Sequence, residues 1–216
     1  MSGSKKEILQ RIRTSLGEKE SRAELPAIQR DYNRKGTSDL KSITNQFALR
    51  VSDYKAVVEY VDKPSICRKV DEICSESGIK KLVIPPGLNP DWLDSLSPGI
   101  ELLHDDPPLS KQDLNNSHGV LTGCRVAVAQ TGTIILDSGA GQGRRALTLL
   151  PDYHICVVES EQITDIFPEA IAKLTDTVRS TGRPVTMISG PSATSDIELD
   201  RVEGVHGPRN LHVLIV

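Results

Sequence analysis

The chain has 216 residues, of which 38% are hydrophobic, 25% charged and 3% aromatic, and its formal net charge is −3. This length favours one domain, with or without an appendage, that buries about 70% of its unfolded surface and needs no disulfide or metal to fold. The few aromatic rings and the acidic balance argue against a nucleic-acid-binding surface, and the lack of a long apolar run or a secretory signal makes a cytoplasmic location the expectation.

The charge is unevenly distributed along the chain. Residues 1–41 contain ten Lys/Arg and six Asp/Glu, a net charge of +4, whereas residues 42–216 have a net charge of −7. The polar, basic segment also lacks the regular periodicity of the rest. We therefore expect an arm over residues 1–38 and a single α/β domain over residues 39–216.

The arm begins with a pattern typical of a short amphipathic helix. Ser4 and Glu7 have capping-box spacing, and Leu9, Ile12 and Leu16 form one apolar stripe. Such a helix is marginally stable alone. The arm is therefore either a flexible tail or an element that docks on a second copy of the chain or on a partner.

From residue 39 the pattern alternates between helical and strand periodicity. The expected elements are a helix over 40–51, a strand over 56–61, a helix over 66–77, a strand over 82–84, a short helix from Pro90 and a strand over 101–104. This alternation is typical of parallel strands joined by crossover helices.

The second half of the domain is richer in β-segments. Runs over 125–130 and 133–137 are separated by Thr131-Gly132, which predicts a tight hairpin. Further strands are expected over 153–158, 184–188 and 211–216, and a helix over 162–174 in which Pro168 introduces a kink or resets the start.

Two segments follow strands and could bind an anion. At the hairpin tip, Gln130, Thr131, Gly132 and Thr133 offer hydroxyl and N–H groups, although a plain turn explains the spacing equally well. The next segment is glycine-rich and ends in arginine, so it is either an anion-binding loop or a flexible one. Its candidate ligand-binding residues are Ser138, Gly139, Gly141, Gly143 and Arg144.

Two further segments contain groups suited to acid–base chemistry or to hydrogen bonding. In the first, Ser192 and Thr194 either cap a helical turn or bind a ligand, and Asp196 and Glu198 supply carboxylates. In the second, His206 lies between glycines before the last strand, as a general acid/base or as a structural histidine.

The four cysteines show no metal-binding pattern. Cys67, Cys74, Cys124 and Cys156 include no CxxC pair. We expect them to be small buried hydrophobic residues, and we expect neither a metal nor an iron–sulfur cluster in this chain.

The order of these segments is more specific than any one of them. The stretches AVAQTGTIILDSGAGQGRRALTLLPDYHICVV and ISGPSATSDIELDRVEGVHGPRNLHVLIV resemble the lactate-utilisation protein C family of LUD-domain proteins, over roughly residues 39–216. The resemblance implies an open, mixed, mostly parallel sheet of the NagB/RpiA/CoA-transferase-like type, preceded here by an N-terminal helical arm.

The resemblance also implies a function. Family members act with iron–sulfur partner proteins in the oxidation of L-lactate to pyruvate, so we expect a component of that system with a small anionic ligand in a glycine-rich cleft. The alternative is a stand-alone CoA-transferase-like or nucleotide- or folate-dependent enzyme, with bound nucleotide or CoA. Family membership does not decide whether the chain is itself catalytic.

One position departs from the pattern of many relatives. They have Glu where this chain has Gln130, and in CoA-transferase-like folds a Glu can be the covalent nucleophile. If the two positions correspond, Gln130 favours a binding role, because its amide retains the shape and hydrogen bonding of Glu without the charge. Asp196 and His206 are then the best candidates for acid–base or anchoring roles.

Overall fold

The computed structural model describes residues 3–17, 31–194, 202–204 and 206–216. It divides into two units, residues 1–32 and residues 33–216. The predicted helix of the arm is present as α1 (Gly3–Ser15). Because α1 begins at Gly3, Ser4 lies inside its first turn and does not precede it, contrary to the capping-box prediction.

The apolar stripe of α1 faces solvent. Ile8, Leu9, Ile12 and Leu16 are all exposed. Arg11 and Glu7, which are one helical turn apart, form an exposed ion pair in which Arg11 donates to Glu7 over 2.7 Å. An exposed pair of this kind contributes only about 0.5 kcal/mol to helix stability.

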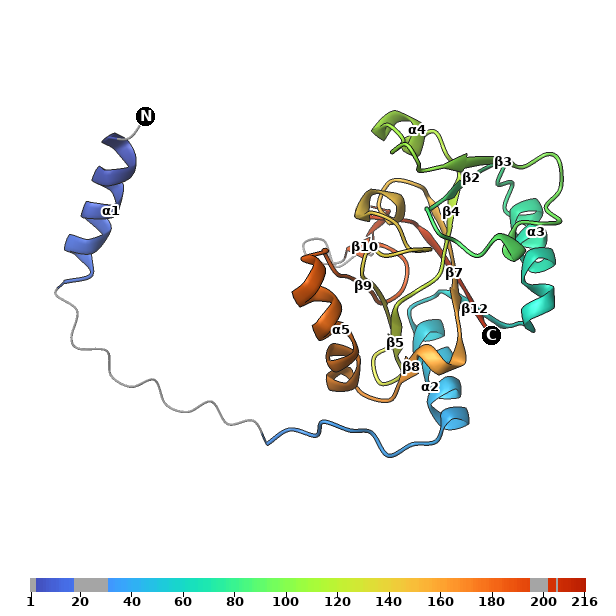
Figure 1. The fold of residues 1–216 in the computed structure, drawn as a ribbon, viewed down its shortest axis with the longest axis horizontal. Coiled ribbons are helices and arrows are strands. Elements are labelled where there is room, and N and C mark those ends of the chain that lie inside the picture. Colours follow the sequence, from blue (N-terminus) through green and yellow to red (C-terminus); the bar gives the residue numbers. More distant parts are fainter. Residues whose placement is uncertain (1–2, 18–30, 195–201, 205) are drawn as a thin grey trace. The chain divides into compact units, whose positions relative to one another are not determined.

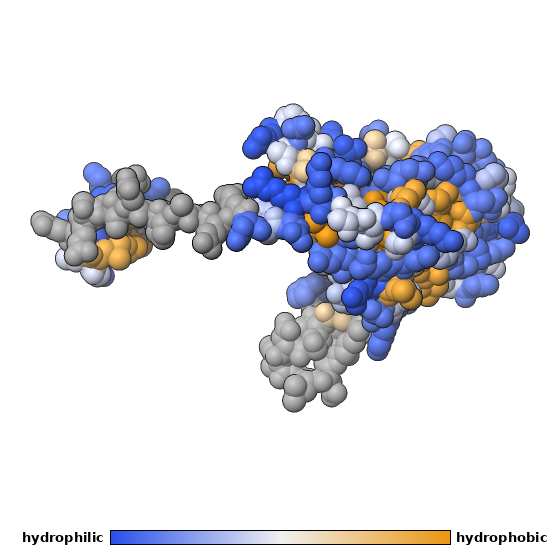
Figure 2. Space-filling model, turned by 90° about the horizontal axis from the view of Figure 1, so that it is seen from below, coloured by the Kyte–Doolittle hydropathy of each residue, from blue (hydrophilic) through white to orange (hydrophobic). Residues whose placement is uncertain are grey.

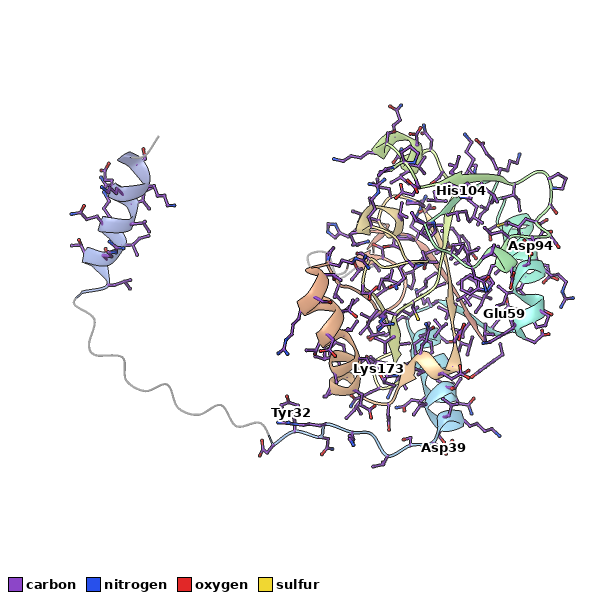
Figure 3. All side chains as sticks on the ribbon, viewed as in Figure 1. Tyr32, Asp39, Glu59, Asp94, His104 and Lys173 are labelled. Atoms are coloured by element: carbon purple, nitrogen blue, oxygen red, sulfur yellow. The ribbon has the colours of Figure 1, made fainter. Side chains whose placement is uncertain are left out.

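The domain begins with a short segment held by two carboxylates. The backbone N–H of Gly36 donates to Glu169, and those of Thr37 and Ser38 both donate to Asp165, at 3.0–3.1 Å. Asp39 then accepts from the backbone N–H of Ser42 and caps α2, where the chain enters that helix (Figure 3). The entry into the domain is therefore fixed by hydrogen bonds from backbone donors.

The helices and strands of the domain follow the predicted order, with additions. The α-helices are α2 (Leu40–Asp53), α3 (Ile66–Glu76), α4 (Lys111–Asn115) and α5 (Phe167–Thr181). The short 3-10 helices are η1 (Lys63–Ser65), η2 (Pro90–Trp92), η3 (Arg145–Thr148) and η4 (Ser160–Gln162). The strands are β1 (Val57–Tyr60), β2 (Lys81–Ile84), β3 (Glu101–His104), β4 (Gly119–Thr122), β5 (Val126–Val128), β6 (Thr133–Leu136), β7 (Tyr153–Val158), β8 (Ile163–Thr164), β9 (Thr186–Ile188), β10 (Ala193–Thr194), β11 (Val202–Glu203) and β12 (Asn210–Ile215).

Six strands form a parallel sheet in the order β1-β12-β7-β4-β2-β3 (Figure 1). Its central strands β7 and β12 are buried along nearly their whole length, as expected for strands covered on both faces. The prediction of an α/β fold with a mostly parallel sheet is confirmed. Strand β4 was not predicted, although it is a short buried run of four residues with turn-forming residues on both sides.

A second, four-stranded sheet has the order β8-β5-β6-β9, and β10 and β11 form a separate antiparallel pair. Strands β5 and β6 form the predicted hairpin, but Val128 pairs with Thr133, so the connection has four residues and not two. The predicted helix over 162–174 is wrong in its first part. Ile163 and Thr164 pair with β5, and Pro168 lies in the first turn of α5, where its missing N–H has no cost.

The two sheets pack face to face and share one core with α2. Phe47 and Val51 of α2 pack with Ile134 of β6 and with Val158 and Val213 of the six-stranded sheet. Helix α3 covers the opposite face of the six-stranded sheet, and α5 covers the outer face of the smaller sheet. The layers are therefore helix, sheet, sheet and helix (Figure 1).

The surface of the domain is mostly polar, with separate apolar areas on the side seen from below (Figure 2). Large apolar side chains that are exposed include Leu40 and Leu49 of α2 and Val57 of the edge strand β1. None of the helices in the described part of the chain is both long and apolar enough to cross a bilayer.

One buried polar contact joins two neighbouring strands of the large sheet. His154 of β7 lies 2.7 Å through Nε2 from the hydroxyl of Thr122 of β4, and both side chains are almost fully buried. Burial, and to a smaller extent the charge of nearby Arg145, lower the pKa of His154 to about 4. The folded protein therefore holds this imidazole in its neutral form at neutral pH.

The burial of His154 makes stability depend on pH in acid. The unfolded chain takes up a proton at His154 below its ordinary pKa of about 6.5, and the folded state does so only near pH 4, so stability is lost as the pH falls between these values. We expect the free energy of unfolding to drop by about 2 kcal/mol from this residue between pH 7 and pH 5. Urea denaturation of the wild type and His154→Gln at both pH values measures it. The same pH dependence in both proteins would contradict the assignment.

Candidate functional site

A cavity of about 230 Å³ lies between the two sheets. Its walls come from η3, the first residues of β7 and β12, the end of β9, and the segments 189–193 and 206–208. Ile188, Pro191 and Leu211 supply apolar wall, and Arg145, Ser189 and Ser192 supply polar groups. The cavity therefore combines an apolar lining with a few polar groups, as small-ligand sites do.

Arg145 provides a cation in this wall. Its Nη1 donates to the carbonyl oxygen of Thr148 over 2.7 Å, and its Nη2 lies 3.4 Å from the carbonyl oxygen of His206. Burial lowers the pKa of the guanidinium, and both acceptors are neutral. Within the described residues no carboxylate pairs with Arg145, and its acceptors there are uncharged oxygens.

The loop that precedes the last strand is fixed to the opposite loop. The backbone N–H of His206 donates to the Ser192 hydroxyl over 3.0 Å, and the N–H of Ser192 donates to the carbonyl of Pro208. Both residues line the cavity, and the His206 side chain is exposed. Of the predicted site residues, the structure therefore brings Ser192 and His206 together.

Three hydroxyls form a chain from the hairpin to the cavity. Thr131 and Thr133 lie 2.7 Å apart through their hydroxyl oxygens, and the Thr133 hydroxyl is 2.8 Å from that of Ser189. Thr133 is buried, whereas Ser189 reaches the cavity. The two predicted threonines thus reach the site indirectly, through a serine that the sequence analysis did not single out.

The rest of the hairpin tip lies away from the cavity. Gln130 is exposed, and its backbone N–H donates to the carbonyl of Asp165 over 3.0 Å. Gly132 has φ +58°, and a Cβ at this position would lie 2.8 Å from Cβ of Arg50 in α2. The turn is therefore built to pack against α2, which explains Gly132 without a ligand.

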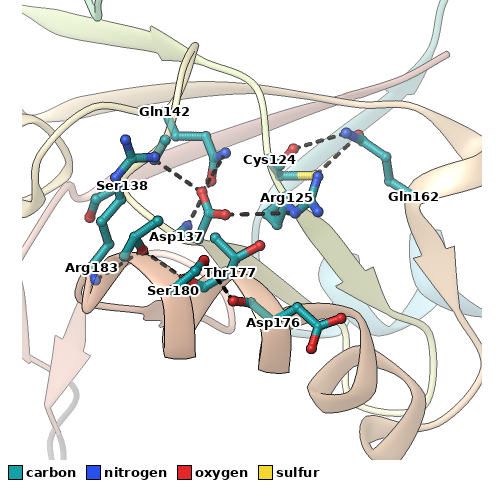
Figure 4. A network of polar contacts seen from close by, with 12 residues as sticks. Cys124, Arg125, Asp137, Ser138, Gln142, Gln162, Asp176, Thr177, Ser180 and Arg183 are labelled. Atoms are coloured by element: carbon teal, nitrogen blue, oxygen red, sulfur yellow. Dashed lines mark hydrogen bonds and ion pairs between the residues drawn. The ribbon is translucent and has the colours of Figure 1, made fainter.

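The glycine-rich loop uses its own backbone donors. The N–H groups of Gly139, Gln142 and Gly143 donate to the side chain of Asp137 or to the carbonyl of Gly139, at 3.0–3.2 Å. Asp137 also accepts from the Gln142 amide and faces Arg125 (Figure 4). The Ser138 hydroxyl donates to the carbonyl of Pro184. An anion in this loop would have to displace these contacts.

The same loop bridges two strand ends. Gly141 donates to the carbonyl of Pro86 after β2 and accepts from the N–H of Gly123 after β4, both at 2.8 Å. The connections that leave β2 and β4 run to opposite sides of the sheet, which is where open α/β sheets commonly bind ligands. Here the loop occupies that place: a Cβ on Gly87 would lie 2.8 Å from Cβ of Ala140.

Arg144 points to a carboxylate of the protein itself. Its Nε and Nη2 donate to the two oxygens of buried Asp105 over 2.9 and 2.8 Å, and Nη2 also reaches the carbonyl of Leu109. Asp105 follows β3, at the carboxyl edge of the large sheet. The cavity and the glycine-rich loop are thus at different places, and Arg145, not Arg144, lines the cavity.

The remaining predicted site residues are only partly covered by the structure. Thr194 belongs to β10, but its side chain is not described. Asp196 and Glu198 lie outside the described residues. Arg145, Ser189 and His154 were missed; Arg145 stood beside Arg144 in the sequence, yet only the fold shows which of the two faces the cavity.

The cysteines are buried thiols. Burial raises the pKa of Cys74 and of Cys156 to about 12, and it raises that of Cys124 as well. They are therefore protonated and poor nucleophiles at neutral pH. In the described part of the chain, no three His, Cys, Asp or Glu side chains are grouped so as to hold a metal ion.

Known proteins show the same fold and sequence pattern. The model of the LUD domain matches residues 45–216. A protein of Deinococcus radiodurans named lactate utilization protein C is 46% identical over 174 residues, 81% of this chain and 79% of that protein. The uncharacterized protein YkgG of Escherichia coli is 29% identical over 153 residues, 67% of this chain and 66% of that protein.

A solved structure agrees with these matches. The crystal structure of a DUF162 family protein from Deinococcus radiodurans superposes with a TM-score of 0.71 at 37% identity, covering 83% of this chain and 99% of the other. The family model and the identity to the first relative each extend over most of the domain. The chain therefore belongs to the LUD-domain family.

Proposed function

We propose that the protein is a component of an L-lactate utilisation system and that it binds a small anionic ligand in the cavity between the sheets. The role in lactate utilisation is supported by the match to lactate utilization protein C. The ligand proposal is supported by the position of Arg145 in the cavity wall.

The contrast between two adjacent arginines carries the ligand proposal. Arg144 has a carboxylate partner in Asp105, whereas the acceptors of Arg145 among the described residues are uncharged oxygens. A ligand carboxylate or phosphate would give this partly buried guanidinium the counter-charge that the described part of the chain does not supply. The local cation also lies in a domain that is acidic overall.

We further propose that iron–sulfur proteins of the same system are the partners of this chain, because this chain has no cysteine pattern for a cluster of its own. The exposed apolar face of α1, flanked by Lys6 and Arg13, supports contact with another protein. Whether α1 is that contact is tested below.

A stand-alone enzyme that acts on a CoA or nucleotide derivative is the second candidate. The guanidinium of Arg145 in the cavity wall favours it as well, since phosphate groups also bind arginine. Calorimetry with CoA, ATP and inorganic phosphate, beside L-lactate and pyruvate, separates the candidates. Micromolar binding of CoA or ATP without binding of the short carboxylates would favour the enzyme.

Replacement of Arg145 should weaken anion binding with little effect on folding. For Arg145→Gln we expect the dissociation constant of L-lactate or pyruvate, measured by calorimetry, to rise about 10-fold or more, because a charge-assisted hydrogen bond is lost. Arg179→Gln is the matched control, since it removes an exposed arginine of α5. Equal binding by wild type and Arg145→Gln would overturn the site.

Replacement of Arg144 should instead affect folding. Arg144→Gln leaves Asp105, which is 4% exposed, without its bidentate partner, and we expect the free energy of unfolding to fall by about 2 kcal/mol. Arg125→Gln is the control: Asp137 retains its other donors, so the loss should stay below about 1 kcal/mol. Urea denaturation measures both, and a smaller effect at Arg144 would contradict its structural role.

The biological role is tested in cells. Deletion of the gene should impair growth on L-lactate in a strain without another lactate dehydrogenase. A tagged chain from lactate-grown cells should recover proteins that contain iron and acid-labile sulfide. If the Ile12→Asp variant no longer recovers these proteins, the contact is made by α1; equal recovery places the contact elsewhere. Normal growth of the deletion strain on L-lactate would contradict the proposed role.

A further inference from the structure

A chain of three hydroxyls ends at Ser189, which lines the same cavity as Arg145. Thr131, Thr133 and Ser189 are linked through hydroxyl oxygens only, at 2.7 and 2.8 Å. Each hydroxyl has one proton and can both donate and accept. The chain therefore has two directions, and either is compatible with these distances.

The direction decides what Ser189 offers to the cavity. If Thr131 donates to Thr133 and Thr133 donates to Ser189, the Ser189 proton is free to donate to a ligand oxygen. If the chain runs the other way, Ser189 uses its proton on Thr133 and presents a lone pair to a ligand hydroxyl. A reversal costs little, because no charge is created.

Buried Thr133 is the residue that makes this device work. It is 4% exposed, and its hydroxyl contacts the other two hydroxyls. It therefore fixes the position of the Ser189 oxygen without committing that oxygen to one role. Thr131, the half-buried residue at the other end of the hydroxyl chain, can direct its own unused proton or lone pair to solvent.

We propose that the cavity takes a short 2-hydroxy- or 2-oxo-carboxylate, with its carboxylate on Arg145 and its C2 oxygen on Ser189, and that Thr133 is the positioning residue that lets Ser189 accept from the hydroxyl form or donate to the oxo form. The inference rests on the proposed anion site. Ile188, Pro191 and Leu211 provide apolar surface for a short alkyl group. One guanidinium matches one carboxylate.

The test compares three carboxylates of similar size by calorimetry: L-lactate, pyruvate and propionate, which lacks the C2 oxygen. We expect lactate and pyruvate each to bind about 5-fold more tightly than propionate, because each forms one additional hydrogen bond to a neutral group. Ser189→Ala should remove this preference and leave propionate binding unchanged. Ser189 is exposed, so this variant retains the fold.

Thr133→Val tests the role of the hydroxyl chain. It replaces the buried hydroxyl by a methyl group of the same shape, and we expect the preference for lactate and pyruvate to fall toward parity with propionate. Ser95→Ala, an exposed serine outside the cavity, is the matched control and should retain the preference.

The outcomes separate this inference from the proposed anion site. Binding of all three carboxylates with equal affinity, lost in Arg145→Gln, would support the site and overturn the role of the hydroxyl chain. A preference that survives Ser189→Ala would overturn it as well. Binding of none of the three would contradict the anion site, and the inference would fail with it.

Discussion

The packing of the four-stranded sheet against the six-stranded sheet is the constraint on which the rest of the domain depends. Phe47 and Val51 of α2 complete that core and hold the two sheets in one layer arrangement. Twisted sheets diverge away from the centre of such a contact. The cavity lies in this region, where the first residues of β7 and β12 face the end of β9. A cavity between the sheets is thus a consequence of how the core closes.

Much of this architecture follows from periodicity. The alternation of apolar residues gave the parallel strands and α2, α3 and the hairpin, because each buries a whole face. The start of α5 could not be read in the same way: Ile163 and Thr164 continue the helical stripe, yet they pair with β5. An apolar segment can satisfy either a helical or a strand pattern, and the tertiary pairing then decides which one forms. Strand β4 was missed although it is as long as β2 and β3, which were predicted, so its length does not explain the omission.

The candidate site was harder to predict than the fold. Glycine spacing indicates that backbone atoms approach something closely, but the sequence does not show whether that is a ligand or another loop. Around Gly141 it is the loops after β2 and β4. In the same way, the sequence does not distinguish Arg144 from Arg145; only the structure shows that Asp105 forms an ion pair with Arg144. Ser189 became relevant only through Thr133, which lies 56 residues earlier.

The burial of the thiols has a consequence for how the protein responds to oxidants. Cys67, Cys74, Cys124 and Cys156 are all buried, and three of them have raised pKa values that keep the sulfur in its unreactive form. At neutral pH these three thiols are therefore poor nucleophiles toward peroxides and disulfides, and the fold keeps them apart from redox chemistry at the surface.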